Sequence, residues 1–325
     1  MHCATSQRFS SWRRYAKSVK VASLACILLT IIWHSHACEK LFSRDESLND
    51  FPKKIWQLSL YSSNDKREFT TNFSTEWQAK NPDYRYECLR DQAIDTFVLD
   101  TYRNDRRIRK AFDTIRHDPI LQADFVRYLI LLREGGIYAD LDTRPQKSIN
   151  DWIPSEYQDQ TNIVIGVEID KGRGQLWRDS PWTVQMSQFT IMAKANHPII
   201  QRVVDNACRN IELFFNSTTD SNGSYFHISF DQVITLTGPK VFTAAVFQYL
   251  SQRMGAEMNG DEVSELNQPI LLADVLILPV NGFASGQVHS NSGSPEDSTA
   301  LVQHSWMGSW VSTHPHESSL LSYTD

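Results

Sequence analysis

The chain lacks several features that define common classes of protein. It has five cysteines but no Cys-x-x-Cys pair, which argues against a structural zinc site. The glycine-containing segment Lys171-Gly-Arg-Gly174 lacks the Gly-Lys-Ser/Thr ending of a P-loop. The chain also lacks an excess of positive charge, because its formal net charge is −6, and this argues against nucleic acid as the main partner. No internal repeat is evident, so a solenoid is not expected.

Length and composition describe a globular protein. The 325 residues suit one large domain or two small ones. Hydrophobic residues make up 41% of the chain, which is enough for a core and excludes disorder over most of the sequence.

The N-terminal region lacks acidic residues, since none occurs before Glu39. Basic residues precede an apolar run at residues 21–33, an order that keeps the basic end cytosolic and the remainder lumenal. The run is shorter than the ~20 residues of a usual membrane span, although flanking residues and a thin membrane relax that requirement. Two interpretations stay open: a signal anchor at residues 19–37, or a signal peptide cleaved near Ala37. The basic residues are Arg8, Arg13, Arg14, Lys17 and Lys20.

Glycosylation signals and cysteines agree with a lumenal protein. Asn-x-Ser/Thr sequences begin at Asn72, Asn216 and Asn222, the last two in a polar stretch that we expect to be an exposed loop. An oxidising lumen permits one disulfide among the cysteines after the apolar run. We favour Cys88–Cys208 and leave Cys38 unpaired, although the sequence alone does not fix the pairing.

The rest of the chain alternates between strand and helix patterns. This alternation predicts a mainly parallel sheet with helices on both faces, and ligands at the carboxyl ends of its strands. Strands are expected at residues 54–60, 84–89, 137–141, 162–168 and 275–279, and helices at 108–114, 120–133, 197–215 and 239–250.

Residues 124–142 form the most informative segment. A helical pattern with Asp124 and Arg127 on one face ends at a Gly-Gly pair, and a short strand then leads to Asp140 and Asp142. Residues i and i+2 of a strand share a face, so both carboxylates are expected to reach one site and to suit Mg²⁺ or Mn²⁺. The alternatives are a solvated loop for the two aspartates and a surface ion pair for Asp124 and Arg127.

The ordered set Asp124-x-x-Arg127-Tyr128, Gly-Gly-x-Tyr138 and Asp140-x-Asp142 resembles the sugar-binding region of glycosyltransferase family 32. Within that family, other blocks resemble the fungal initiation-specific α-1,6-mannosyltransferases, and together they extend over residues 51–312. These blocks are Pro52-Lys-Lys-Ile-Trp-Gln57, the stretch from Phe189 to Pro198, Leu236-Thr-Gly-Pro-Lys240 and His304-Ser-Trp-Met-Gly-Ser-Trp310.

The resemblance implies a GT-A-like, Rossmann-like α/β fold in one catalytic domain. It implies a metal-dependent, retaining transfer of mannose from GDP-mannose to an N-linked glycan, in an α-1,6 linkage. By the same resemblance the chain is a single-pass type II protein of the Golgi or ER membrane, with a complex of glycosyltransferases as a further partner. The expected parts are a cytoplasmic tail (1–18), a signal anchor (19–37), a short stem (38–50) and a lumenal catalytic domain (51–325).

Roles for individual residues follow from the same resemblance. Asp142 is expected to bind the metal ion directly, Asp140 to contact both the ion and the ribose, and His304 to be the third ligand. An imidazole ligand favours Mn²⁺ over Mg²⁺. Asp124 and Arg127 are expected to hold hydroxyls of the donor sugar, and they complete the expected catalytic set with the two motif aspartates.

Three aromatic residues complete the expected site. Tyr138 is expected to line the pocket, and the alternative is a core aromatic. Trp56 is expected to end the first strand and stack on the base of the nucleotide, with an ordinary core tryptophan as the alternative. Trp310 is expected to cover the diphosphate or the acceptor.

Other functions remain to be weighed. Another sugar or a sphingolipid acceptor is one alternative, although enzymes of that branch usually have further membrane spans and none is evident after Trp33. A catalytically inactive glycan-binding relative is another, although both motif aspartates are present. A metal-dependent hydrolase would need a base that activates water, and the sequence identifies none. No clear nucleophile stands out either, so the attack is expected from the face of the leaving phosphate.

Overall fold

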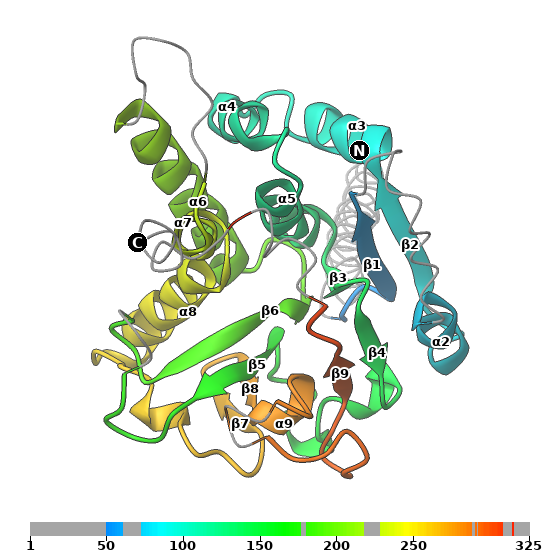
Figure 1. Cartoon of the computed structure of the whole chain (residues 1–325). Coiled ribbons are helices and arrows are strands. Elements are labelled where there is room, and N and C mark those ends of the chain that lie inside the picture. The colour runs from blue at the N-terminus through cyan, green and yellow to red at the C-terminus, as the bar shows by residue number, and fades with distance from the viewer. Residues whose placement is uncertain are drawn as a thin grey trace, which may run out of the picture. The chain divides into compact units, whose positions relative to one another are not determined.

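The computed structural model describes residues 50–60, 73–176, 180–217, 228–287, 290, 292–307 and 314 (Figure 1). The described chain from Phe51 onward forms one compact unit. The expected tail, the signal anchor and nearly all of the stem lie outside the described residues, as do Asn72, Asn222 and Trp310. Within the described part, no helix has both the length and the apolar character that a membrane crossing requires.

A seven-stranded sheet runs through the described part of this unit in the order β2-β1-β3-β6-β5-β8-β7. Strands β2, β1, β3, β5 and β8 run in one direction, and β6 and β7 run against them, which confirms the prediction of a mainly parallel sheet. The strands are β1 (Lys54–Ser59), β2 (Arg85–Arg90), β3 (Gly136–Ala139), β5 (Ile163–Asp170), β6 (Val184–Ala193), β7 (Ile270–Leu272) and β8 (Val275–Leu278).

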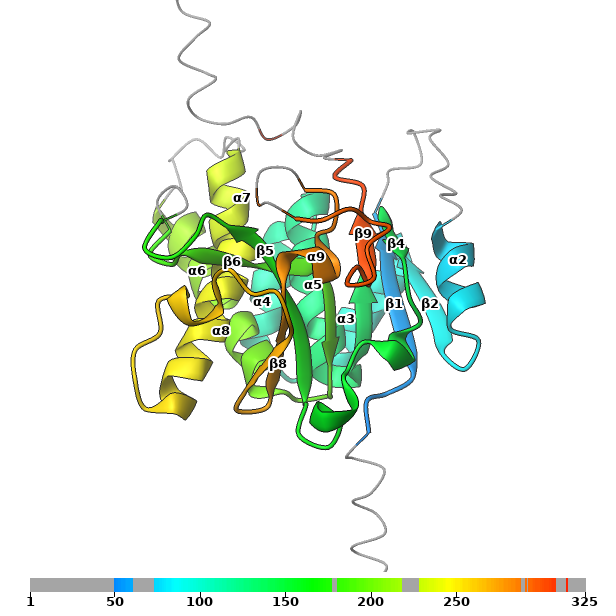
Figure 2. The ribbon, with the colours of Figure 1, turned by 90° about the horizontal axis from the view of Figure 1, so that it is seen from below.

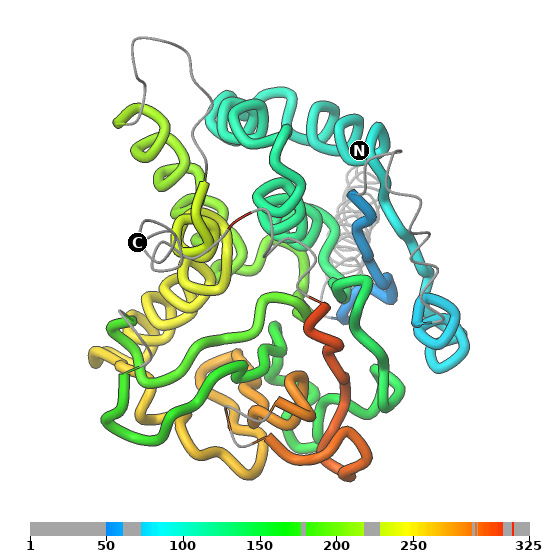
Figure 3. Tube along the Cα trace, in the orientation of Figure 1, coloured from blue at the N-terminus to red at the C-terminus, as the bar shows by residue number. Residues whose placement is uncertain are grey.

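A second, two-stranded sheet joins β4 (Thr143–Pro145) to β9 (Val302–His304). The two strands are far apart in the sequence and lie side by side in the trace (Figure 3). The described helices are α2 (Phe73–Lys80), α3 (Asp91–Thr101), α4 (Arg106–Ile115), α5 (Pro119–Glu134), α6 (Pro198–Ser217), α7 (Phe230–Leu236), α8 (Pro239–Met254) and α9 (Val280–Phe283).

The two faces of the large sheet have different covers. Helices α5, α6 and α8 pack on one face, while α9 and the β4–β9 sheet lie on the other (Figures 1 and 2). Alternate residues of one strand enter opposite cores, since Ile163 and Ile165 belong to the helix-side core and Val164 to the other. This period of two is the expected consequence of a pleated strand that is buried on both faces.

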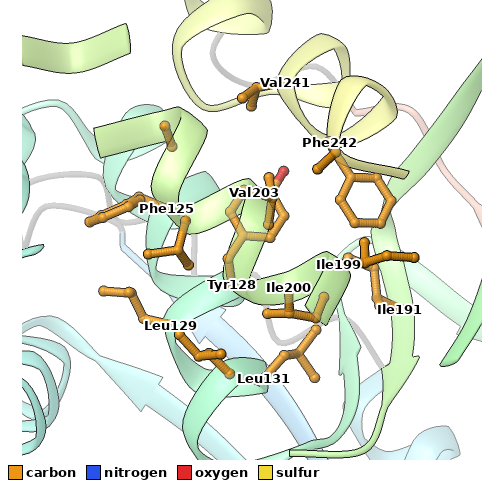
Figure 4. Close-up of a cluster of buried hydrophobic side chains, with 14 of the residues drawn as sticks. Phe125, Tyr128, Leu129, Leu131, Ile191, Ile199, Ile200, Val203, Val241 and Phe242 are labelled. Atoms are coloured by element: carbon orange, nitrogen blue, oxygen red, sulfur yellow. The ribbon is translucent and has the colours of Figure 1, made fainter. Parts of the chain in front are cut away.

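The helix-side core depends on contacts between helices that are distant in sequence. Figure 4 shows Phe125 and Tyr128 of α5 in the same cluster as Ile200 and Val203 of α6. The ring of Tyr128 stacks on Phe242 of α8 with centroids 5.8 Å apart. Burial of each such side chain contributes about 1.5–3 kcal/mol, so this cluster fixes α5 firmly against the sheet.

The junction between α5 and β3 explains the Gly-Gly pair. Gly135 and Gly136 have φ values of 63° and 95°, in the region that residues with a Cβ rarely adopt. A Cβ on Gly135 would lie 2.6 Å from the amide nitrogen of Ala195, and one on Gly136 would lie 2.6 Å from the carbonyl oxygen of Lys54. Only glycine therefore lets the chain turn from the helix into a strand beside β1.

Two further sequence predictions, about a disulfide and about a loop, are wrong. Cys88, on β2, and Cys208, buried in α6, are free thiols, so they do not form the favoured disulfide. Asn216 lies in the last turn of α6 rather than in a loop, because the helix continues to Ser217.

Candidate functional site

Asp140 lies just beyond the carboxyl end of β3, between β1 and β6. Its backbone N–H donates to the carbonyl of Phe189 (2.8 Å), and its carbonyl accepts from Nε2 of Gln57 (3.0 Å). Strand β3 ends at Ala139, so Asp140 and Asp142 belong to the turn that leads into β4. The predicted strand at residues 137–141 therefore extends two residues too far, and backbone contacts with neighbouring strands position Asp140. The two aspartates still reach one site, as expected.

The β4–β9 pairing brings His304 beside Asp142. Thr143 pairs with His304 in the register of this sheet, and Nε2 of His304 lies 3.1 Å from Oδ1 of Asp142. The amide of Met307 donates to Oδ2 of the same carboxylate at 3.1 Å. Burial alone would raise the pKa of Asp142, but the hydrogen bonds from His304 and Met307 outweigh it and lower that pKa, which keeps the carboxylate charged.

Asp140, Asp142 and His304 together have the composition of a metal site. One potential ligand atom from each lies within 4.8 Å of the other two. Nδ1 of His304 is buried, and no described residue hydrogen-bonds it. Two carboxylates and an imidazole suit Mn²⁺. Because Nδ1 of His304 has no hydrogen-bond partner among the described residues, the hydrogen bonding of this side chain is incomplete. These residues therefore fit a divalent cation.

A buried group of charges supports Asp140 from α5. Nη2 of Arg127 lies 2.9 Å from Oδ1 of Asp124 and 3.2 Å from Oδ1 of Asp140. The Asp124 and Arg127 side chains are only 2% and 3% exposed, so the alternative of a surface ion pair is wrong. Burial raises the pKa of Asp124 to about 6 despite the opposing effect of Arg127, while the surrounding acidic groups keep Arg127 charged.

Polar residues outside the recognised motif complete this group. Asp124 also accepts from Nε2 of Gln188 (3.2 Å) and from the Thr237 hydroxyl (3.3 Å), which links α5 to β6 and to the turn before α8. The buried Nε of Arg127 has no hydrogen-bond partner among the described residues. Gln188 precedes the recognised block at Phe189, and neither Gln188 nor Gln57 was expected in the site. Each glutamine lies at the edge of a block that resembles the family, since Gln57 ends the first block and Gln188 directly precedes the second. That position was the signal in the sequence that could have identified them.

Tyr138 is a core aromatic residue that also contacts the candidate site. It is 1% exposed and belongs to the core. Its hydroxyl donates to Oδ1 of Asp140 (2.6 Å), and the Arg127 guanidinium lies over its ring at 5.0 Å. Tyr138 therefore orients Asp140 from within the core rather than lining an open pocket.

The expectation for Trp56 is not met. Trp56 is the third residue of β1, not its end, and it is 5% exposed in the helix-side core. Its Nε1 donates to the carbonyl of Gly135 at 3.0 Å. The ring is therefore enclosed by the core, which is the alternative interpretation of Trp56, and it offers no open face to a base.

An exposed aromatic residue near His304 was missed. Trp306 is 38% exposed, and its ring centroid lies 4.1 Å from that of His304, which stacks on Phe189 at 4.2 Å. Trp306 lies in the same block, residues 304–310, as Trp310, for which a role was expected and which lies outside the described residues. Trp306 thus provides an accessible ring directly beside the candidate metal ligands.

Comparisons with known proteins found several similar sequences. Residues 68–159 match the family model described as "Glycosyltransferase sugar-binding region containing DXD motif". The chain is 35% identical over 269 residues to an initiation-specific α-1,6-mannosyltransferase of Schizosaccharomyces pombe, covering 80% of this chain and 64% of that one. It thus spans slightly less than two thirds of the length of that relative.

Two further similarities were found. The initiation-specific α-1,6-mannosyltransferase of Candida albicans is 28% identical over 291 residues, covering 83% of this chain and 74% of that one. The solved structure of PaToxG Glycosyltransferase is 20% identical, with a TM-score of 0.41, and the likeness covers 66% of this chain and 78% of that one.

Proposed function

We propose that this chain, which contains the DXD-containing sugar-binding region of glycosyltransferases, transfers a sugar from a nucleotide donor to a glycan acceptor. The observation that most supports this proposal is the grouping of Asp140, Asp142 and His304 beside the buried Asp124–Arg127 pair. A nucleotide sugar requires both parts of this arrangement: a cation site for its diphosphate and hydrogen-bonding groups for its sugar. The site follows the carboxyl end of a strand in a mainly parallel sheet, as in nucleotide-binding α/β folds, and a GT-A-like fold is part of the proposal.

The finer assignment is mannose transfer from GDP-mannose to an N-linked glycan through an α-1,6 linkage. The similarity to two initiation-specific α-1,6-mannosyltransferases supports the choice of mannose and of the α-1,6 linkage. The proposal also includes a Golgi or ER location, with residues 19–37 as a type II signal anchor and residues 51–325 as the lumenal domain. Association with other glycosyltransferases belongs to the same proposal.

Asp142, His304 and Asp140 would hold the metal ion, with Mn²⁺ favoured by the imidazole. When bound, a divalent ion supplies positive charge that stabilises the diphosphate as it leaves. Arg127 and Tyr138 fix the orientation of Asp140, and the Met307 amide fixes that of Asp142, so the two carboxylates are preorganised.

The transfer breaks the bond between the sugar carbon and the phosphate oxygen and forms one to the acceptor oxygen. In the retaining reaction that we propose, the acceptor hydroxyl attacks from the face of the leaving phosphate, which takes the proton of that hydroxyl. Asp124 and Arg127 would hold hydroxyls of the donor sugar through local adjustment, because both are buried and already paired. The unpartnered Nε of Arg127 is the donor that such a contact would use.

The test uses the full-length protein in detergent with a panel of nucleotide sugars, with Mn²⁺ or a chelator, and measures release of nucleoside diphosphate. We expect Mn²⁺-dependent release from GDP-mannose and its loss in Asp142→Asn. Release from UDP-sugars alone would reject mannose and keep the reaction class. No release from any donor, with or without an α-mannoside acceptor, would reject the proposal in favour of a glycan-binding protein.

A further inference from the structure

Glu168 lies near the end of β5, where the strand is irregular. The pairing of β5 with β6 shifts register between Ile165 and Val167 and again between Val167 and Ile169, so Glu168 lies within a bulged region. Bulges of this kind occur next to active sites, where they redirect a side chain. Glu168 is only 8% exposed, and no role was assigned to it from the sequence.

The carboxyl group of Glu168 has few partners for a buried acid. Its Oε2 accepts a hydrogen bond from Nε2 of Gln185 at 3.1 Å. No described residue hydrogen-bonds Oε1, and no described cation forms an ion pair with the group. Burial raises the pKa of Glu168 to about 7. Oε1 is not among the buried polar atoms that lack a partner, so this oxygen is accessible to a ligand at the surface of the site.

Asp170, two residues further along β5, provides an internal comparison. Its Oδ1 accepts from the amide of Gly172 (2.9 Å) and from the hydroxyl of Ser264 (2.7 Å), and its Oδ2 accepts from the amide of Glu265. Every oxygen of Asp170 therefore has a partner within the protein, which is the pattern of a structural carboxylate. Glu168 has the same degree of burial without that satisfaction.

Glu168 borders the candidate site from the side opposite β1. Strand β6 separates β3 from β5, so the strand that leads to Asp140 and the strand that carries Glu168 lie about 10 Å apart across the sheet. The charges of His304, Asp140 and Arg127 all act on Glu168, which agrees with this proximity. A ligand at Asp140 could thus extend across β6 to reach Oε1.

From this position we infer that Glu168 accepts a hydrogen bond from a hydroxyl group of the sugar acceptor through Oε1, while Gln185 holds Oε2. The inference rests on the proposed function and deepens it by identifying an acceptor-binding residue. A carboxylate suits this task because it accepts hydrogen bonds from the hydroxyls of a sugar, and ionised acceptors form the stronger bonds.

The experiment compares full-length wild type with Glu168→Gln, which keeps the shape of the side chain. The control is Glu257→Gln, because Glu257 is an exposed glutamate. With GDP-mannose and Mn²⁺, an α-mannoside oligosaccharide is varied as acceptor. We expect kcat/KM for the acceptor to fall about 10- to 100-fold in Glu168→Gln, the loss that corresponds to one hydrogen bond to a charged group.

Affinity for the nucleoside diphosphate with Mn²⁺, measured by calorimetry, distinguishes acceptor binding from a general defect. We expect the same affinity in wild type and in Glu168→Gln. Acceptor kinetics equal to wild type, or a parallel loss of nucleotide affinity, would each overturn the inference. Glu168→Asp keeps the charge but shortens the side chain, and it replaces Glu168→Gln if that variant does not fold.

A separate measurement applies if no transfer is detected in the wild type. Calorimetry with the α-mannoside oligosaccharide alone tests the contact without catalysis. Binding by wild type and Glu257→Gln, with weaker binding by Glu168→Gln, would support the acceptor contact even if the proposed donor were wrong. Equal binding by all three proteins would reject the contact independently of the reaction.

Discussion

Two histidine–aspartate pairs lie at opposite ends of the large sheet. His197 and Asp274 precede α6 and β8, at the amino ends of the strands, with Nε2 3.3 Å from Oδ2. His304 and Asp142 lie at the carboxyl ends, with Nε2 3.1 Å from Oδ1. The two pairs have nearly the same geometry, so the pair alone does not distinguish a structural contact from a ligand site.

The surroundings of the two pairs differ. Asp274 also accepts from Tyr249 (2.6 Å) and Asn162 (2.9 Å), and Nδ1 of His197 accepts from the amide of Ile199 (3.2 Å). Nδ1 of His304, in contrast, is buried without a described partner. A complete network stabilises the fold, and an incomplete one beside a second carboxylate is the mark of a ligand site.

The largest expected effect is on activity at the carboxyl end. In Asp142→Asn, we expect transfer to fall by at least about 10²-fold, because a charged metal ligand is lost where charge develops. Asp274→Asn should keep the wild-type rate per folded molecule. Nucleoside diphosphate release is measured for both, with circular dichroism to confirm folding. Equal loss of activity in both variants would remove the distinction between the two ends.

Metal binding sharpens the same comparison without an activity assay. At an Mn²⁺ concentration of about 100 Kd, binding to the folded state adds about 2.7 kcal/mol to the free energy of unfolding. We expect this gain, measured as a rise in Tm that a chelator reverses, in wild type and in Asp274→Asn. Its persistence in Asp142→Asn would exclude that carboxylate as a ligand.

At the amino end the expected effect is on stability. Asp274→Ala leaves donors from His197, Tyr249 and Asn162 without their acceptor, so we expect the free energy of unfolding to fall by about 1–3 kcal/mol. Urea unfolding of wild type and variant measures the difference. No destabilisation would show that the complete network is not what holds this end of the sheet.

The smallest expected effect is a change in how the free energy of unfolding depends on pH in the acidic range. Partial burial alone would raise the pKa of Asp274, but hydrogen bonds from His197, Tyr249 and Asn162 outweigh it and lower that pKa well below its ordinary value. A carboxyl whose pKa is lower in the folded state contributes stability that is present above its unfolded pKa, about 3.9, and lost as pH falls toward the folded value. Wild type should therefore lose stability more steeply than Asp274→Asn below about pH 4. Unfolding curves at several pH values measure the two slopes, and equal slopes would contradict this assignment.

Local patterns predicted most of what surrounds the motif. The predicted helix at 120–133, the glycine junction and the strand after it are confirmed as α5 and β3, because each depends on residues that are near in sequence. Strand β6 was not predicted, although it supplies Gln188 and Phe189 to the site. It is buried on both faces, so its sequence lacks the alternation that marks a half-exposed strand.

Several of the wrong or missing predictions concern contacts between distant segments. Trp56 is fixed in the core by the carbonyl of Gly135, 79 residues away, and nothing near Trp56 in the sequence signals that partner. The half-satisfied carboxyl of Glu168 depends on the bulged pairing of β5 with β6. His304 could be suggested only through the family resemblance, because its position beside Asp142 depends on the β4–β9 register.

The β4–β9 pairing also has a consequence for the order of events during synthesis. His304 meets Asp142 across 162 positions of the chain, so the ribosome finishes the first two candidate ligands long before the third. At about 5–20 residues per second, that interval is about 10 to 30 s. A nascent chain can therefore begin to fold around α5 before His304 is synthesised. The candidate cation site is completed only when β9 pairs with β4.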